Sequence, residues 1–173
     1  MFTTREVATV AVLSAAGGAL SVPLGYAGNM INAVPGVPFG SPQLLAGIHV
    51  LWMVLAGLVT RRFGAAAATG ALKGLVELSL FSFHGPLVLP IAIAEGLATE
   101  ACLLVLGRRA GTPAYITGGF GAAANVLVLR MLVLGALPWG LIALMVVFAF
   151  ASGAFFSGYV GGKALLAILP LLR

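Results

Sequence analysis

The chain has 173 residues, of which 61% are hydrophobic and 8% are charged, with a formal net charge of +5. This composition excludes an ordinary soluble domain, which needs a polar outer face. The basic residues lie at the ends of apolar runs rather than in one patch, so the positive-inside rule explains them better than nucleic-acid binding does. The sequence therefore predicts an all-α, polytopic membrane protein with a single domain over residues 1–173 and no nucleic-acid partner.

Six apolar runs predict a bundle of six transmembrane helices in the lipid bilayer. The predicted spans are residues 7–24, residues 44–60, the two arms of a hairpin from Arg61 to Arg109 that turns at residues 81–86, residues 114–134, and residues 141–165. The first run resembles a signal peptide only weakly, and we expect it to remain as a span.

The stretch from Pro23 to Pro42 is rich in glycine, proline and asparagine. Such a composition predicts a loop, here a long outer loop between the first and second helices. Loops of this length often serve as lids over binding sites. Tyr26 and Asn29 are its candidate ligand contacts, and an inert surface loop is the alternative.

The basic residues predict the orientation of the chain. Apart from Lys73 and Arg130, which lie within spans, they fall at the N-terminus, after the second and fourth spans, and at or beyond the far end of the sixth: Arg5, Arg61, Arg62, Arg108, Arg109, Lys163 and Arg173. With six spans these positions share one side of the membrane, and the loops of the other side contain no lysine or arginine. The positive-inside rule then places both termini in the cytoplasm.

Small residues recur every four positions in the first span, at Ala11, Ala15 and Ala19. Such spacing lets two helices approach closely in lipid. The stripe either packs within the same bundle or docks another membrane subunit.

Three of the 4 acidic residues lie in the Arg61–Arg109 hairpin, within apolar sequence. Ionisable groups in such a setting are candidates for function. From the helical rise, Glu77 lies roughly 12 Å and Glu95 roughly 15 Å from the turn, with Lys73 at roughly 18 Å and Glu100 at roughly 22 Å. Lys73 could pair with either of the two shallower acids, which would be a structural role. Glu100 faces elsewhere, so we expect a structural or coupling role for it.

Other polar and aromatic groups gather in the same outer half of the bundle. His49 and Trp52 are three residues apart and share a helical face, while Asn125 lies in the fifth span. A carboxylate beside an indole suits a small, flat, nitrogen-rich ligand. Residues in this half can also have purely structural roles. His49 can be a histidine that is satisfied inside the bundle, Trp139 an anchor at the membrane interface, and Arg130 a side chain that snorkels to the outer surface.

The sequence contains no motif for chemistry of its own. It has no Walker A loop, no set of nucleophile, histidine and acid, and no aspartate. Two histidines and one cysteine make a poor metal site. We therefore expect no enzyme activity, no catalytic residue, no cofactor and no metal.

Five segments carry a resemblance to a known family: TTREVATVAVLSAA, PGVPFGSPQLLAGIHVLW, GAAAATGALKGLVELSLFSFHG, IAEGLATEACLLVLGRR and SGAFFSGYVGGKALLAIL. With these, the chain resembles the substrate-binding S component of energy-coupling factor (ECF) transporters. Within that group it is most similar to the YkoE-type family, which is linked to thiamine or its hydroxymethylpyrimidine precursor. The resemblance implies a membrane subunit that binds a vitamin or precursor from outside and associates with a transmembrane T component and two ABC-type ATPases.

The residues and the resemblance together predict roles for particular side chains. Glu77 and Glu95 would bind the polar edge of the ligand, and His49 and Trp52 would line its ring. Asn125 would add a hydrogen bond, the loop around Tyr26 and Asn29 would close over the ligand, and the T component would dock on the alanine stripe Ala11, Ala15 and Ala19. The alternatives are an S component for a different small nutrient and a membrane scaffold without a ligand.

Overall fold

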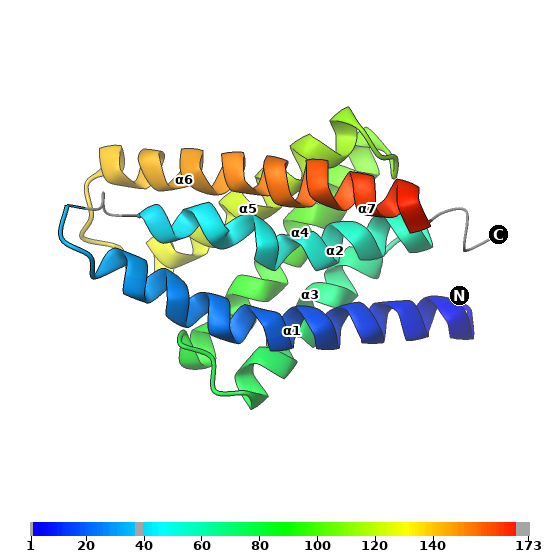
Figure 1. Cartoon of the computed structure of the whole chain (residues 1–173), viewed down its shortest axis with the longest axis horizontal. Coiled ribbons are helices and arrows are strands. Elements are labelled where there is room, and N and C mark those ends of the chain that lie inside the picture. The colour runs from blue at the N-terminus through cyan, green and yellow to red at the C-terminus, as the bar shows by residue number, and fades with distance from the viewer. Residues whose placement is uncertain (1, 37–39, 169–173) are drawn as a thin grey trace.

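The computed structural model describes residues 2–36 and 40–168, although not the side chain of residue 168, and these residues form helices and short connections without a strand. The predicted all-α class is confirmed. The elements are α1 (Thr4–Asn32), η1 (Ser41–Leu45), α2 (Ala46–Thr60), α3 (Ala65–Ser79), η2 (Gly85–Leu87), α4 (Val88–Leu106), α5 (Thr112–Leu132), α6 (Trp139–Gly153), η3 (Ala154–Val160) and α7 (Gly161–Ile168). Figure 1 shows α6 and α7 running on as one long helix, with η3 between them.

Five helical segments of the described chain are long and apolar enough to cross a membrane: Thr4–Asn32, Ser41–Thr60, Gly85–Leu106, Thr112–Leu132 and Trp139–Ala167. The exception among the six predicted spans is α3, which has 15 residues. At the helical rise it covers only about 22 Å. Left-handed backbone at Arg61 and Gly64 separates α3 from the preceding helix and sets its late start.

The long outer loop predicted from Pro23 to Pro42 is wrong over its first half. Helix α1 continues through Pro23 to Asn32, and only residues 33–40 connect it to η1, with 37–39 outside the described residues. In an apolar setting an unpaired backbone group costs several kcal/mol, so glycine and proline interrupt a helix less readily than they do in water. The candidate contacts Tyr26 and Asn29 are therefore helical residues.

Close helix packing depends on glycine at particular contacts. A Cβ added to Gly70 of α3 would lie 2.5 Å from the carbonyl oxygen of Ala92 in α4. A Cβ on Gly118 of α5 would lie 2.3 Å from the carbonyl oxygen of Gly153 in α6. Without a side chain at these positions the backbones touch, which is how helices gain packing energy in lipid.

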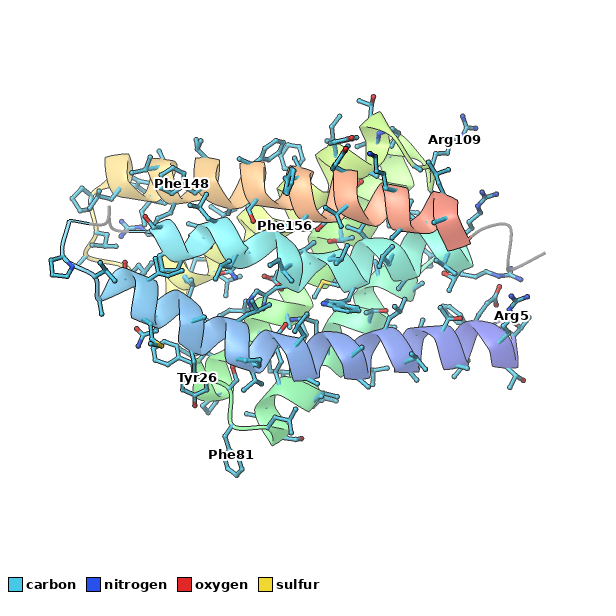
Figure 2. All side chains as sticks on the ribbon, viewed as in Figure 1. Arg5, Tyr26, Phe81, Arg109, Phe148 and Phe156 are labelled. Carbon is cyan, nitrogen blue, oxygen red and sulfur yellow. The ribbon has the colours of Figure 1, made fainter. Side chains whose placement is uncertain are left out.

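Most basic residues of the described chain gather at one end of the bundle, and the exceptions are Lys73 and Arg130. Figure 1 shows the start of α1 and the end of α7 at the same end, and Figure 2 shows Arg5 and Arg109 there. Arg62, between α2 and α3, pairs with Glu6 of α1 at 2.8 Å. This grouping agrees with the predicted topology, whereas Arg173 lies outside the described residues. Which side of the membrane this end faces stays a prediction.

Candidate functional site

A cavity of about 390 Å³ opens at the end of the bundle opposite the arginine end, where Arg5 and Arg109 lie. Its walls come from the last two turns of α1, from η1 and the start of α2, from the end of α3 and the following turn, and from α4 and α5. Its volume lies within the range of pockets for small molecules. Five of the seven residues predicted to bind a ligand line it: Asn29, His49, Glu77, Glu95 and Asn125.

Glu95 is the most isolated acid of the cavity. Its side chain is only 1% exposed, and its Oε1 accepts a hydrogen bond of 3.0 Å from Nδ2 of Asn125. Within the described chain, the Asn125 Oδ1 is buried and has no hydrogen-bond partner. A buried carboxylate and a buried amide oxygen both need a donor. This part of the wall therefore presents hydrogen-bond acceptors.

Glu77 has a cationic partner on its own helix. Lys73 and Glu77 form an ion pair one turn apart on α3, and both side chains are almost fully buried. Such a pair is stable in a low-dielectric site only when the charges compensate each other. Both residues line the cavity beside Glu95, so the three groups together leave one carboxylate without a basic partner. Of the two partners predicted for Lys73, the structure selects Glu77.

Two histidines line the cavity, and only one of them was predicted from the sequence to do so. His49 lies in α2, and His84 lies in the turn between α3 and α4. Burial lowers the pKa of His84, and the nearby positive charge of Lys73 lowers it further. His84 is therefore neutral at neutral pH and can offer one donor and one acceptor. In the sequence, only the FSFHGP turn could have pointed to His84. This turn must lie over the ends of two helices that carry buried charges.

Trp52 does not line the cavity, which corrects its predicted place beside the ligand. Its ring lies against Gly17 of α1, where an added Cβ would be 2.6 Å from the tryptophan Cγ. Residues three apart in a helix differ by about 60° around the axis. That difference lets His49 face the cavity while Trp52 fills the gap between α1 and α2.

Tyr26 also lies outside the cavity lining. Its side chain is 48% exposed, and its hydroxyl donates a hydrogen bond of 3.1 Å to the carbonyl oxygen of Phe81. The predicted direct contact with a ligand is therefore corrected: Tyr26 touches the wall of the cavity from outside. The prediction failed because α1 stays helical here and turns Tyr26 away from its neighbours Gly25 and Asn29, which do line the cavity.

The remaining buried acid, Glu100, serves a different place. Its Oε2 accepts a hydrogen bond of 3.0 Å from the backbone nitrogen of Ala66, in the first turn of α3, and its other oxygen pairs with Arg108. It thus joins the start of α3 to the end of α4 and does not line the cavity. Arg130 donates to the carbonyls of Leu134 and Gly135, which end α5.

The alanine stripe of α1 faces outward. Ala11, Ala15 and Ala19 are exposed, whereas Ser14 and Gly18 are buried. A Cβ on Gly18 would lie 2.6 Å from the Cβ of Val76, so this second small stripe packs against α3. The alanine stripe is consequently free for contact with another helix.

The site contains polar groups for binding rather than a reactive set. Among the described residues, no group of three or more histidine, cysteine, aspartate or glutamate side chains is arranged to hold a metal ion. The described residues thus form a bundle of helices, five segments of which are long and apolar enough to cross a membrane, with a cavity of small-molecule size at one end.

Comparisons with known proteins identify the family of the chain. Residues 5–125 match the family described as ABC-type cobalt transport system, permease component, and the chain belongs to that family. The putative HMP/thiamine permease protein YkoE of Bacillus subtilis (strain 168) is 27% identical over 160 residues, or 91% of this chain and 79% of that protein. A crystal structure of an S-component of ECF transporter matches 99% of this chain and 87% of its own, with a TM-score of 0.87 and 24% identity.

These findings confirm the resemblance predicted from the sequence. The chain has the fold of an ECF S component, and it is a membrane component of a transport system rather than an enzyme. The word cobalt in the family description and the HMP/thiamine in the relative's name point to different substrates.

Proposed function

We propose that the chain is the substrate-binding S component of an ECF-type uptake transporter, and that the cavity around Glu95 receives its ligand. The arrangement of Glu95 and Asn125 carries this proposal, because a buried carboxylate without a basic partner faces a cavity of ligand size. Such a group stays buried at a cost unless something compensates it. A ligand that brings hydrogen-bond donors or positive charge is that compensation.

The ligand that fits best is thiamine or its hydroxymethylpyrimidine precursor. An aminopyrimidine edge offers an amino group and, when protonated, a ring N–H, which match carboxylate and amide oxygens. The flat ring would lie beside His49, Phe83 and His84, all of which line the cavity. The printed name of the Bacillus relative supports the same ligands.

Two alternatives are weaker. A cobalt ion as substrate would need several histidine or carboxylate ligands, and the described residues hold no such group around one point. A scaffold without a ligand would have its outer half filled by side chains, whereas this bundle encloses a cavity. An S component for another donor-rich nutrient is the remaining competitor.

The transporter would place the cavity outside and the arginine end in the cytoplasm, and the T component with its two ATPases would meet the alanine stripe. Orientation can be tested in a Cys102→Ser background with single cysteines. A membrane-impermeant maleimide added to intact cells should label Phe81→Cys, at a site that is 85% exposed, and should not label Thr3→Cys. The reverse pattern would contradict the orientation.

Replacing Ala15 by leucine should weaken co-purification with the T component, because a bulky side chain separates helices that dock through small residues. Ala101→Leu, on the exposed side of α4, is the control and should leave co-purification unchanged. Equal recovery of the T component with both variants would contradict docking on the stripe.

The ligand itself is tested by calorimetric titration of the purified protein with hydroxymethylpyrimidine, thiamine and Co²⁺. We expect at least one of the two organic ligands to bind with 1:1 stoichiometry at micromolar concentration or below, and Co²⁺ not to bind. Binding of Co²⁺ alone would favour the metal alternative, and binding of none of the three would overturn the choice of ligand.

A further inference from the structure

The turn between α3 and α4, residues 80–87, forms one wall of the cavity. Three of its residues, Phe83, His84 and Leu87, line the cavity. The turn is closed by short backbone hydrogen bonds, including Gly85 N to Ser82 O at 2.8 Å. Phe81, at its tip, has a positive φ of 57° and is 85% exposed. On its outer side, the turn therefore packs against few other residues.

Tyr26 of α1 holds this turn from outside. Its hydroxyl donates to the Phe81 carbonyl at 3.1 Å, and its ring meets the ring of Phe83 edge-on, with centroids 5.9 Å apart. Phe83 in turn contacts His84 edge-on at 5.6 Å. Figure 2 shows Tyr26 and Phe81 on the same flank of the bundle, where the turn projects below α1.

The turn also lies close to the neighbouring Gly25. A Cβ at Gly25 would lie 3.7 Å from the Cβ of Phe83, so the turn rests directly on α1. Two adjacent residues of α1 thus meet the turn, Gly25 by its close approach and Tyr26 by the hydrogen bond. Because Tyr26 does not line the cavity, any effect it has on a ligand must pass through the turn.

We propose that Tyr26 is a positioning residue that latches the α3–α4 turn to α1, keeps Phe83 and His84 in the cavity wall, and so slows the release of the bound ligand. The inference rests on the proposed function for its ligand, although the latch itself does not. When the latch opens, the turn can move outward and uncover the cavity. Removing the hydroxyl lowers the fraction of molecules with the turn in place, and apparent affinity falls with that fraction.

The latch can be tested without a ligand by hydrogen–deuterium exchange of the purified protein. Tyr26→Phe removes the hydroxyl and keeps the ring. The control is Tyr115→Phe, which removes a hydroxyl from another exposed tyrosine, in α5. Loss of one neutral hydrogen bond corresponds to roughly 2- to 10-fold faster exchange. We expect it only at the amides of residues 80–85 and 87 and only in Tyr26→Phe. Unchanged exchange there would overturn the latch.

The effect on the ligand is tested by stopped-flow binding of hydroxymethylpyrimidine and thiamine. For whichever binds the wild type, Tyr26→Phe should raise the dissociation rate roughly 2- to 10-fold and leave the number of binding-competent molecules unchanged. Tyr26→Ala, which also removes the contact with Phe83, should raise it further. A merely structural role would lower the binding-competent fraction and leave the dissociation rate of the remainder unaltered.

The outcomes separate the two proposals. If neither ligand binds the wild type, the proposed ligands fail, and the exchange experiment alone decides the latch. If a ligand binds and exchange at residues 80–87 rises while the dissociation rate stays the same, Tyr26 holds the turn but does not position it for the ligand, and the inference is overturned.

Discussion

Glu95 and Glu100 lie on the same helix, five residues apart, and both are nearly fully buried, yet their surroundings differ. Glu100 is 4% exposed and has a basic partner in Arg108 and a backbone donor at Ala66. Glu95 is 1% exposed and has one neutral donor, the Asn125 amide. A buried acid with a basic partner has a structural role. A buried acid that has no basic partner and lies at the edge of a cavity can instead pair with a positive charge of a ligand or accept hydrogen bonds from it.

We expect the largest effect, a loss of thermal stability, when Glu100 is replaced. Glu100→Ala leaves Arg108 without its partner, and breaking a buried pair in this way costs about 3–5 kcal/mol. For a domain of this size the midpoint of thermal unfolding should fall by the order of 10 °C. Static light scattering during heating in detergent would measure this fall.

The matched control is the ion pair between Glu6 and Arg62, whose arginine is half exposed. Breaking a solvent-exposed pair has little effect on stability. Glu6→Gln should therefore shift the midpoint far less than Glu100→Ala does. Equal shifts in the two variants would show that Glu100 does not stabilise the contact between the start of α3 and the end of α4.

Glu95→Gln should produce the next largest effect, and on binding rather than on stability. A hydrogen bond to a charged group contributes about 1.5–3 kcal/mol, so affinity for the ligand should fall roughly 10- to 150-fold. Glutamine keeps the volume and the bond from Asn125, so the unfolding midpoint should not fall. Calorimetric titration measures the affinity; a variant that binds as tightly as the wild type would remove Glu95 from the site.

Asn125→Ala should weaken binding less. It removes the donor that orients Glu95. It also removes an acceptor that a ligand amino group could use, and one such neutral hydrogen bond is worth about 0.5–1.5 kcal/mol. Affinity should therefore fall roughly 2- to 10-fold, because the carboxylate itself remains. Thr117→Ala, elsewhere on α5 and away from the cavity, is the control and should bind normally. A matching loss in Thr117→Ala would indicate a general packing effect.

The smallest expected effect is a pH dependence at His84. Its pKa is lowered in the folded protein, so the unfolded chain binds the proton more readily. Stability from this group is fully present above the unfolded pKa of about 6.5 and is lost as pH falls toward the folded pKa. The fall of the unfolding midpoint between pH 7.5 and pH 5.5 should be smaller in His84→Gln. The same fall in both proteins would show that His84 contributes nothing to it.

Much of the fold could be predicted because all the helices of the described bundle except α3 belong to long apolar runs. The predicted spans 44–60 and 114–134 agree with Ser41–Thr60 and Thr112–Leu132 within a few residues. The error at Pro23 arose because glycine and proline were weighted as they act in water, whereas a helix in an apolar setting continues through them.

The cavity could be predicted only in part. Depth along a helix follows from the rise per residue, and it correctly grouped Glu77 with Glu95 and set Glu100 apart. Which neighbour a side chain meets depends on the pairing of helices. Trp52 faces Gly17 of α1, and no pattern within α2 reveals that partner. His84 was missed for the same reason, because its place depends on how the turn folds back over α3 and α4.

The most direct test of the account is the affinity for hydroxymethylpyrimidine of Glu95→Gln and Glu100→Gln, titrated side by side in the same detergent. The two variants make the same chemical change on the same helix. We predict that Glu95→Gln binds at least about 10-fold more weakly than the wild type, while the folded fraction of Glu100→Gln binds as the wild type does. Equal affinities in the two variants, or a loss confined to Glu100→Gln, would contradict a ligand site at Glu95.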